Sequence, residues 1–229
     1  MPVLRVATFN VKHGDNGGGR VDLRRLGNAC AALSADVLAI QEVDRFARRA
    51  WFQDEMRVIA RATGLEAVFG EAARRRWRTY GNVLLARGPI SDVEVIRLPR
   101  PNGGEQRVAI VARVDVDGVS LSVGATHLSF RAGEGLPQLE VLLGALAGRE
   151  GPRVLFGDLN LGPEVVEPAV TSAGYRLAPT GPTFPAKAPR TRIDFVAVSG
   201  LEILAASTPH AGMSDHLPVV AEVGGADGK

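Results

Sequence analysis

Short apolar stretches bounded by turn-forming residues recur along the chain and predict strands. The first, Leu4-Arg5-Val6-Ala7-Thr8-Phe9, alternates apolar and polar positions, which is typical of a strand. Asp117-Gly118 separates two later stretches and is typical of a tight hairpin turn. The predicted strands cover residues 4–9, 36–40, 83–86, 93–96, 108–111, 114–116, 119–125, 153–156, 193–198, 202–204 and 218–223.

Helical spacing of apolar residues predicts three helices. Asp22 is expected to cap the first. Its apolar face consists of Leu23, Leu26, Cys30 and Leu33. The second is predicted over residues 53–63, with Gly64 as its C-terminal stop, and the third over 139–146.

Helices and strands are intermingled along the chain, with hairpins as well as strand–helix units. This pattern predicts mixed sheets covered by helices. We find no linker-like segment and no internal repeat, so residues 1–223 are expected to form a single domain. The three successive glycines within residues 14–19 predict a loop. Residues 224–229 are expected to form a disordered tail.

The composition of the 229 residues is that of a globular protein, with 45% hydrophobic and 23% charged residues. The single cysteine, Cys30, excludes a disulfide framework and a cysteine-based zinc site. No apolar stretch approaches the roughly 18–20 residues of a membrane helix. The N-terminus lacks the basic and apolar regions of a signal peptide, so we expect a cytoplasmic protein.

Charge is spread unevenly, although the formal net charge is only +2. Residues 1–100 hold 17 Arg and Lys against 11 Asp and Glu, whereas residues 101–229 hold 10 against 14. Much of the excess lies in the cluster Arg74-Arg75-Arg76-Trp77-Arg78, which is expected to form a loop. Such a cluster can bind a polyanion, but charge alone favours an ordinary solvated face.

Polar and ionisable side chains recur where predicted apolar strands end. Asn10, Glu42 and His127 each follow or end a strand, Asp158 and Asn160 follow another, and Asp215-His216 precedes the last one. A single such residue is readily explained as a cap of the next turn or helix. Five such places in one chain favour an open cleft at the strand ends.

These residue types are suited to phosphoryl chemistry. Carboxylates of Glu42 and Asp215 and amide oxygens of Asn10 and Asn160 are ligands that Mg²⁺ or Mn²⁺ prefers. The lack of thiolates disfavours zinc, although the histidines leave it open. Histidines near a cation and a phosphate can carry a proton or stabilise an oxyanion.

Two local motifs give the most specific indication of function. In Gly157-Asp158-Leu159-Asn160, the glycine is expected to turn the chain off its strand, and the two polar side chains to point the same way on an extended segment. An Asx turn at a helix entry is an equally good interpretation of this motif alone. Ser214-Asp215-His216 places two adjacent ionisable residues where core packing has no use for them.

Together with five further segments, these motifs resemble the endonuclease/exonuclease/phosphatase superfamily, in the family's order and over residues 7 to 216. The matching segments are Ala7-Thr8-Phe9-Asn10, Ile40-Gln41-Glu42-Val43, Gly81-Asn82-Val83-Leu84-Leu85-Ala86-Arg87, Thr126-His127-Leu128, Gly157-Asp158-Leu159-Asn160, Arg192-Ile193-Asp194-Phe195 and Ser214-Asp215-His216. The resemblance implies an α/β four-layer sandwich, with two mixed, mainly antiparallel sheets packed face to face and helices outside.

The resemblance also implies roles for the site residues. Glu42 is similar to the family's main metal ligand, with Asn10 and Asp215 beside it. His216 resembles the catalytic histidine, and Asp194 its orienting carboxylate. Further implied contributors to catalysis or substrate binding are Asp158, Asn160, His127, Arg107 and Asn82.

Several of these assignments have simpler alternatives. Asp194 could be an ordinary strand carboxylate that pairs with Arg192. Asn82 could cap a turn, and Arg107 could lie on a solvated strand face. His13 and His210 belong to no family motif and receive no role.

The sequence therefore predicts a hydrolase that uses Mg²⁺ or Mn²⁺ to cleave phosphodiester bonds. Nucleic acid is the favoured substrate, because Trp77 among Arg74, Arg75 and Arg76 could stack on a base or follow a backbone. A phosphodiesterase or phosphatase acting on a small molecule or lipid headgroup is the alternative. The short segment Phe9 to Gly14, followed by Asp22, resembles such relatives as much as nucleases. An inactive binding module is a minor alternative.

Overall fold

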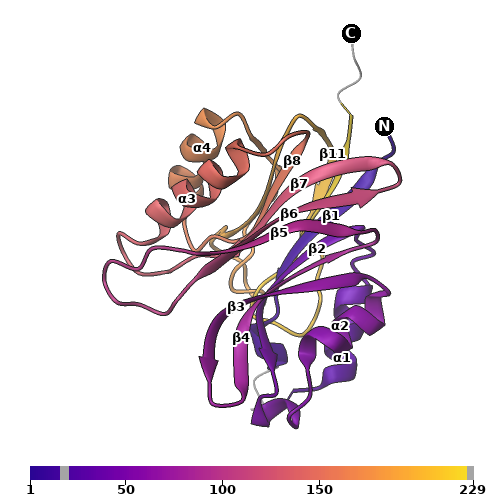
Figure 1. Cartoon of the computed structure of the whole chain (residues 1–229), viewed down its shortest axis with the longest axis vertical. Coiled ribbons are helices and arrows are strands. Elements are labelled where there is room, and N and C mark those ends of the chain that lie inside the picture. Colours follow the sequence, from indigo (N-terminus) through magenta and orange to yellow (C-terminus); the bar gives the residue numbers. More distant parts are fainter. Residues whose placement is uncertain (16–20, 226–229) are drawn as a thin grey trace.

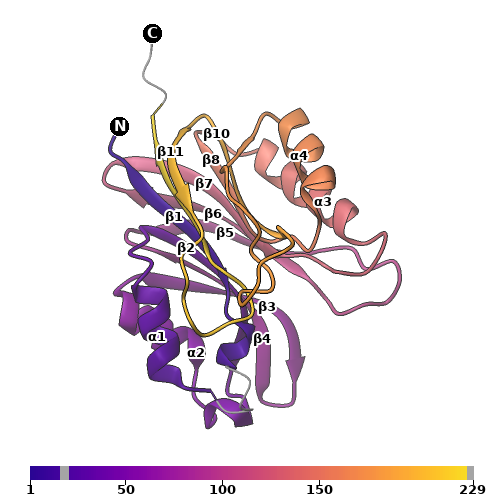
Figure 2. The same ribbon diagram turned by 180° about the vertical axis from the view of Figure 1, so that it is seen from behind.

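The computed structural model describes residues 1–15 and 21–225. Its elements form two six-stranded sheets, packed face to face, with a pair of helices covering each outer face (Figures 1 and 2). This arrangement confirms the predicted four-layer α/β sandwich. Part of the predicted 14–19 loop and of the predicted 224–229 tail lies outside the described residues.

The first sheet has the order β11-β12-β1-β2-β4-β3, and α1 and α2 cover its outer face. Only the pair β1–β2 is parallel in this sheet. Its elements are β1 (Leu4–Asn10), η1 (Lys12–Gly14), α1 (Leu23–Ala31), β2 (Val37–Arg45), η2 (Arg48–Ala50), α2 (Glu55–Thr63), β3 (Glu66–Arg75), β4 (Arg78–Ala86), β11 (Glu202–Ser207) and β12 (Val219–Gly224).

The second sheet has the order β5-β6-β7-β8-β10-β9, and α3 and α4 cover its outer face. Here only β7–β8 is parallel. Its elements are β5 (Ile90–Arg97), β6 (Val108–Val116), β7 (Val119–His127), α3 (Gly135–Ala147), β8 (Arg153–Asp158), α4 (Pro163–Ser172), β9 (Arg176–Leu177) and β10 (Asp194–Ser199).

Three buried apolar clusters correspond to the three interfaces of this sandwich. In β1, Leu4 and Val6 face the other sheet, whereas Ala7 and Phe9 face α1 and α2. The same alternation in β6 directs Ile110 toward the first sheet and leaves its neighbours under α3. Because the central strands bury both faces, they contain nearly continuous apolar stretches, whereas the edge strands β5 and β11 are partly exposed.

The local signals read from the sequence are largely realised. The side chain of Asp22 accepts a hydrogen bond from the Arg25 amide and caps α1, and Gly64 ends α2 in the left-handed conformation with φ 72°. Asp117 and Gly118 form the turn between β6 and β7. The helix predicted over 139–146 begins earlier, at Gly135.

The arginine-rich cluster is a hairpin, not the predicted loop. Arg74 and Arg75 end β3, Arg76 and Trp77 form the turn, and Arg78 begins β4. The β3–β4 hairpin extends beyond the other strands, at the end of the molecule opposite the N-terminus (Figure 1).

Candidate active site

Polar residues from both sheets meet at one end of the sandwich. Asn10 ends β1, His127 ends β7 and Asp158 ends β8, while Asp194 begins the antiparallel β10. His127 pairs with Asp158 in the parallel ladder, and Asp158 pairs with Asp194 in the antiparallel one. The topology thus places these side chains together although they are far apart in sequence.

Glu42 was expected to follow the end of its strand, but it lies within β2. The pairing of β2 with β4 is irregular between Ile40 and Val43, and Glu42 there has φ 59°. A bulge of this kind redirects one side chain out of the alternating pattern. A non-glycine residue in the left-handed region is strained, and such residues concentrate at functional sites.

His13, which sequence reasoning left without a role, contacts Glu42. Its Nε2 lies 3.0 Å from Oε2 of Glu42, and its Nδ1 lies 3.6 Å from Oδ2 of Asp44. Burial opposes the charge on His13, but the two carboxylates raise its pKa to about 9. Burial would also raise the pKa of Glu42, but hydrogen bonds from His13 and Asn10 hold it well below its ordinary value. Glu42 is therefore an ionised carboxylate.

The amide of Asn10 connects the two halves of the site. Its Nδ2 donates to Oε1 of Glu42 at 3.0 Å and to Oδ2 of Asp158 at 2.9 Å. Asp215, the third predicted metal ligand, forms an ion pair in which its Oδ2 lies 2.7 Å from Nζ of Lys12. Asn10 and Glu42 are thus brought into direct contact, whereas the carboxylate of Asp215 is held by a lysine.

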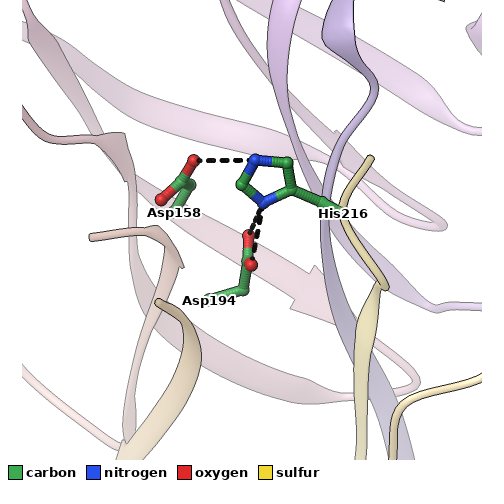
Figure 3. A group of neighbouring side chains, drawn as sticks. All are labelled: Asp158, Asp194 and His216. Atoms are coloured by element: carbon green, nitrogen blue, oxygen red, sulfur yellow. Dashed lines mark hydrogen bonds and ion pairs between the residues drawn. The ribbon is translucent and has the colours of Figure 1, made fainter. Parts of the chain in front are cut away.

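His216 lies between two carboxylates, as Figure 3 shows. Its Nδ1 is 3.0 Å from Oδ2 of Asp194, and its Nε2 is 3.8 Å from Oδ2 of Asp158. Asp194 also accepts a hydrogen bond from the hydroxyl of Thr183 at 2.6 Å, so its position is set from two sides. The alternative pairing of Asp194 with Arg192 does not occur, because Arg192 donates to the carbonyl of Ala178.

The electrostatics of this group favour proton transfer. Burial lowers the pKa of His216, but the hydrogen bond and charge of Asp194, together with Asp158 and Asp215, raise it to about 9. Burial and the charge of Asp194 raise the pKa of Asp158. A cationic imidazole beside a carboxylate with a raised pKa is an acid–base pair able to work near neutral pH.

His127 is neutral and contacts both Arg107 and Asn160. Burial and the charge of Arg107 lower its pKa well below the ordinary value. Nη1 of Arg107 lies 3.0 Å from Nδ1 of His127. Because a guanidinium only donates, Nδ1 accepts and the ring proton lies on Nε2, 3.4 Å from Oδ2 of Asp158, which can accept it. Nδ2 of Asn160 lies 3.0 Å from the same Nε2, but both groups are then donors, and Nδ2 of Asn160 donates instead to the carbonyl of Leu128.

The Gly157–Asn160 motif differs from the expected extended segment. The Asn160 amide donates to Oδ1 of Asp158, and Asn160 has φ 50°, so the motif forms an Asx-type turn. Gly157 lies inside β8, and a Cβ there would be 2.1 Å from the carbonyl oxygen of Thr126. The glycine is therefore required for the close approach of β7 rather than for leaving the strand.

A cavity of about 390 Å³ opens beside Glu42, and Arg78 of the arginine-rich cluster lines it. Its lining residues are His13, Glu42, Ala73, Arg78, Tyr80, Glu105, Arg107 and Phe130. Arg78 also donates to Asp44. Arg107 is 5% exposed, which excludes the solvated-face alternative.

Among the predicted substrate contacts whose side chains the structure describes, Arg74, Arg76, Trp77 and Asn82 do not line this cavity. Arg74 is paired with Glu71 at 2.6 Å, and the guanidinium of Arg76 lies over the exposed ring of Trp77. The backbone of Arg75 pairs with Arg78 in the hairpin. Asn82 donates to the carbonyl of Val108 at 3.1 Å and so links β4 to the second sheet rather than capping a turn.

Two arrangements have donor sets that suit a hard cation. Glu42 is ionised, lines the cavity and lies against Asn10, so this pair fits a divalent ion that prefers oxygen ligands. Within residues 1–15 and 21–225, the one group of three or more His, Cys, Asp or Glu ligand atoms that converge is Asp158, Asp194 and His216. Those three are already held together by the contacts seen in Figure 3.

Structural comparisons place the chain among proteins of the same fold. A crystal structure of an endonuclease/exonuclease/phosphatase from Beutenbergia cavernae DSM 12333 matches with a TM-score of 0.82 and 24% identity, covering 97% of this chain and 72% of that one. The catalytic domain of human Nocturnin with bound sulfate matches with a TM-score of 0.73 and 18% identity, covering 98% and 95%. D. rerio TDP2 complexed with a single-strand DNA product gives 0.73 and 18%, covering 98% and 100%. A search of curated proteins gives no match.

Family assignment comes from the sequence itself. The family model described as "Endonuclease/Exonuclease/phosphatase family" matches residues 7–216, which include every residue brought together at this site. No helix within the described residues is long and apolar enough to span a membrane. The chain belongs to the endonuclease/exonuclease/phosphatase family of phosphate-ester hydrolases.

Proposed function

We propose that this protein is a divalent-metal-dependent phosphodiesterase of the nuclease type. The observation that carries the proposal is the bridging amide of Asn10, which bonds both Glu42 and Asp158. It puts an ionised carboxylate suited to Mg²⁺ or Mn²⁺ directly beside an acid–base pair, at the edge of a cavity that also holds an arginine. When bound, the metal supplies Lewis-acid stabilisation of charge on a phosphoryl oxygen.

The chain's own residues have distinct parts in the proposed reaction. Asp158 orients the attacking water and accepts its proton. His216, held by Asp194, donates its Nε2 proton toward the phosphate or the leaving oxygen. Arg107, Asn160 and the Nε2–H of His127 stabilise negative charge on the phosphoryl oxygens, and Arg107 also donates to Nδ1 of His127. Glu42, Asn10 and Asp215 are the proposed metal-binding residues.

Nucleic acid is the proposed substrate, and Arg74, Arg75, Arg76, Trp77 and Asn82 remain proposed contributors to its binding. One observation favours the second candidate, an enzyme for a small molecule or a lipid headgroup. Glu71 neutralises Arg74 and Asp44 neutralises Arg78, so the hairpin offers a polyanion less free charge than the sequence indicates.

A substrate panel tests the proposal. Purified protein with Mg²⁺ or Mn²⁺ is assayed on single-stranded DNA, duplex DNA, RNA, bis-p-nitrophenyl phosphate and phosphoinositides, with His216→Ala as the matched control for contaminating activity. The proposal predicts turnover of diesters, highest on nucleic acid, and a loss of about 100-fold or more in the control. Turnover confined to a lipid headgroup would favour the second candidate, and equal rates for both proteins would contradict catalysis at this site.

A further inference from the structure

An aromatic side chain stands at the rim of the cavity and has no part in the proposed chemistry. Phe130 is 73% exposed and lines the cavity together with the hairpin residue Arg78. A single exposed phenylalanine is common on protein surfaces. Its meaning here depends on how firmly it is held and on what lies beside it.

The loop that carries Phe130 is held by buried polar side chains. The amide of Ser129 donates to Oε1 of Gln138 at 2.8 Å, and its hydroxyl donates to Oε2 of Glu134 at 2.7 Å. Ser129 is 3% exposed and both partners are fully buried. Such buried hydrogen bonds rigidify the backbone that they hold. The aromatic ring is therefore presented from a preorganised support.

The same loop is tied to the catalytic group. The Leu128 amide donates to the carbonyl of Asp158 at 2.9 Å, and Nδ2 of Asn160 donates to the carbonyl of Leu128 at 3.1 Å. That Nδ2 also contacts His127. Phe130 thus lies only two residues from a position that is bonded to the residues proposed to act on phosphorus.

The charge of the cavity restricts what the ring can contact. Among the described residues, no carboxylate forms an ion pair with Arg107, whose buried Nε also lacks a partner. A buried guanidinium in this state favours an anion beside it, whereas the carboxylates of Glu42 and Glu105 line other parts of the same cavity. A ligand with a phosphate at Arg107 and a neutral planar ring over Phe130 satisfies both features. The volume of about 390 Å³ is within the usual range for ligand sites.

We propose that Phe130 is a stacking platform for an unpaired nucleobase joined to the scissile phosphate. This inference rests on the proposed function and narrows its substrate class to nucleotidyl phosphodiesters in single strands. Bases within a duplex are stacked on one another, so their faces are not open to a side chain. Stacking of a base on an aromatic side chain tolerates any sequence, because every base has a π-face.

Equilibrium binding tests the inference separately from hydrolysis. Binding of a fluorescent single-stranded oligonucleotide is measured in EDTA beside a strand of equal length and charge composed of abasic sites. Phe130→Leu should weaken binding of the base-bearing strand about tenfold and change binding of the abasic strand little. Phe130→Trp should restore the difference. Phe52→Leu, which removes an exposed ring outside the cavity, is the matched control.

Each alternative outcome has a defined meaning. If wild type does not distinguish the two strands, or if Phe130→Leu binds both as wild type does, the inference is overturned. It is also overturned if glycerophosphocholine competes for the site and loses that ability in Phe130→Leu, since the ring would then hold a cationic headgroup. Wild type that binds bases through Phe130 but hydrolyses no phosphodiester would contradict only the proposed function.

Discussion

Nε2 of His13 lies 3.0 Å from Oε2 of Glu42, while Asn10 bonds the other oxygen of the same carboxylate. Both His13 and Glu42 have left-handed backbone conformations, with φ 55° and 59°. Two strained residues in contact, 29 positions apart in the sequence numbering, are maintained only where the surroundings hold them. The carboxylate is therefore oriented before any ligand binds.

His13 is predicted to strengthen divalent-metal binding by orienting Glu42. His13→Ala should weaken Mn²⁺ binding about tenfold by calorimetry, in the range expected when a group that orients a ligand is removed. His13→Gln retains a donor and should keep most of the affinity. Tighter binding in His13→Ala would contradict this role and identify His13 as a cation that competes with the metal.

Asp194 is predicted to act through His216. Asp194→Asn keeps the shape of the side chain but removes the charge that holds the imidazole, so kcat should fall about 100-fold or more with little change in KM. Thr183→Val, which removes one hydrogen bond to Asp194, should cause a smaller loss in the same direction. Near-normal turnover of Asp194→Asn would remove His216 from its proposed role.

Much of the fold follows from local sequence signals. Asp22 and Gly64 act within one turn of their own helices, and Asp117-Gly118 acts between adjacent strands. Because these effects are local, the sequence is enough to predict them. The alternating apolar positions likewise identify most strands, including the ones that carry Asn10, His127 and Asp158.

Two elements that the sequence did not predict, β3 and α4, depend on tertiary packing. β3 contains Gly70, Glu71 and three alanines, which are poor strand formers, and it forms because β4 pairs with it along its length. At Gly70 a Cβ would lie 2.6 Å from Cγ1 of Ile110, so the glycine permits contact between the sheets. α4 contains Pro168 and several β-branched residues and is stabilised by burying Val166 and Val170.

The sequence predicted the site residues that belong to a motif, but it did not predict the site residues outside the motifs. The bulge at Glu42, the contact with His13 and the loop holding Thr183 all come from backbone positions far apart in sequence. Phe130 also lines the cavity and has no motif of its own, whereas Arg78 belongs to the arginine-rich cluster. His13 follows the Asn10 motif by only three residues, and that proximity was the one available signal.

Glu55 is predicted to make stability depend on pH. It is fully buried, and burial followed by the nearby charge of Asp44 raises its pKa from 4.5 to about 8. The folded state then binds this proton more tightly than the unfolded chain does. Its contribution to the free energy of unfolding is complete below about pH 4.5 and is lost as pH rises toward 8, at about 1.4 kcal/mol per pKa unit.

Glu55→Gln tests this prediction, because the amide is neutral at every pH and still accepts the hydrogen bond from the Asp44 amide. Urea unfolding between pH 5.5 and 8.5 should show a smaller decline for the variant, which should be the more stable protein at pH 8.5. Parallel curves for the two proteins would show that Glu55 is already ionised in the folded state.

The hairpin arginines are predicted to contact phosphates away from the scissile one. Each such contact releases counterions, so the logarithm of affinity should fall with the logarithm of salt concentration by about 0.7 to 0.9 per contact. Replacing Arg74, Arg75 and Arg76 by Ala should flatten that slope for nucleic acid and leave hydrolysis of bis-p-nitrophenyl phosphate nearly unchanged. Arg97→Ala, exposed on β5, is the matched control. An unchanged slope in the triple variant would reduce these arginines to a solvated face.

The most direct test of the proposed mechanism is whether diester hydrolysis requires a divalent cation held by Glu42. Wild-type protein should lose turnover in saturating EDTA and regain it with Mg²⁺ or Mn²⁺. Glu42→Gln should lose about 100-fold or more in turnover and require more metal, while its thermal unfolding in EDTA shows that it folds. Wild-type turnover that survives saturating EDTA would contradict metal-dependent hydrolysis. A Glu42→Gln variant with the metal dependence of wild type would contradict metal binding by Glu42.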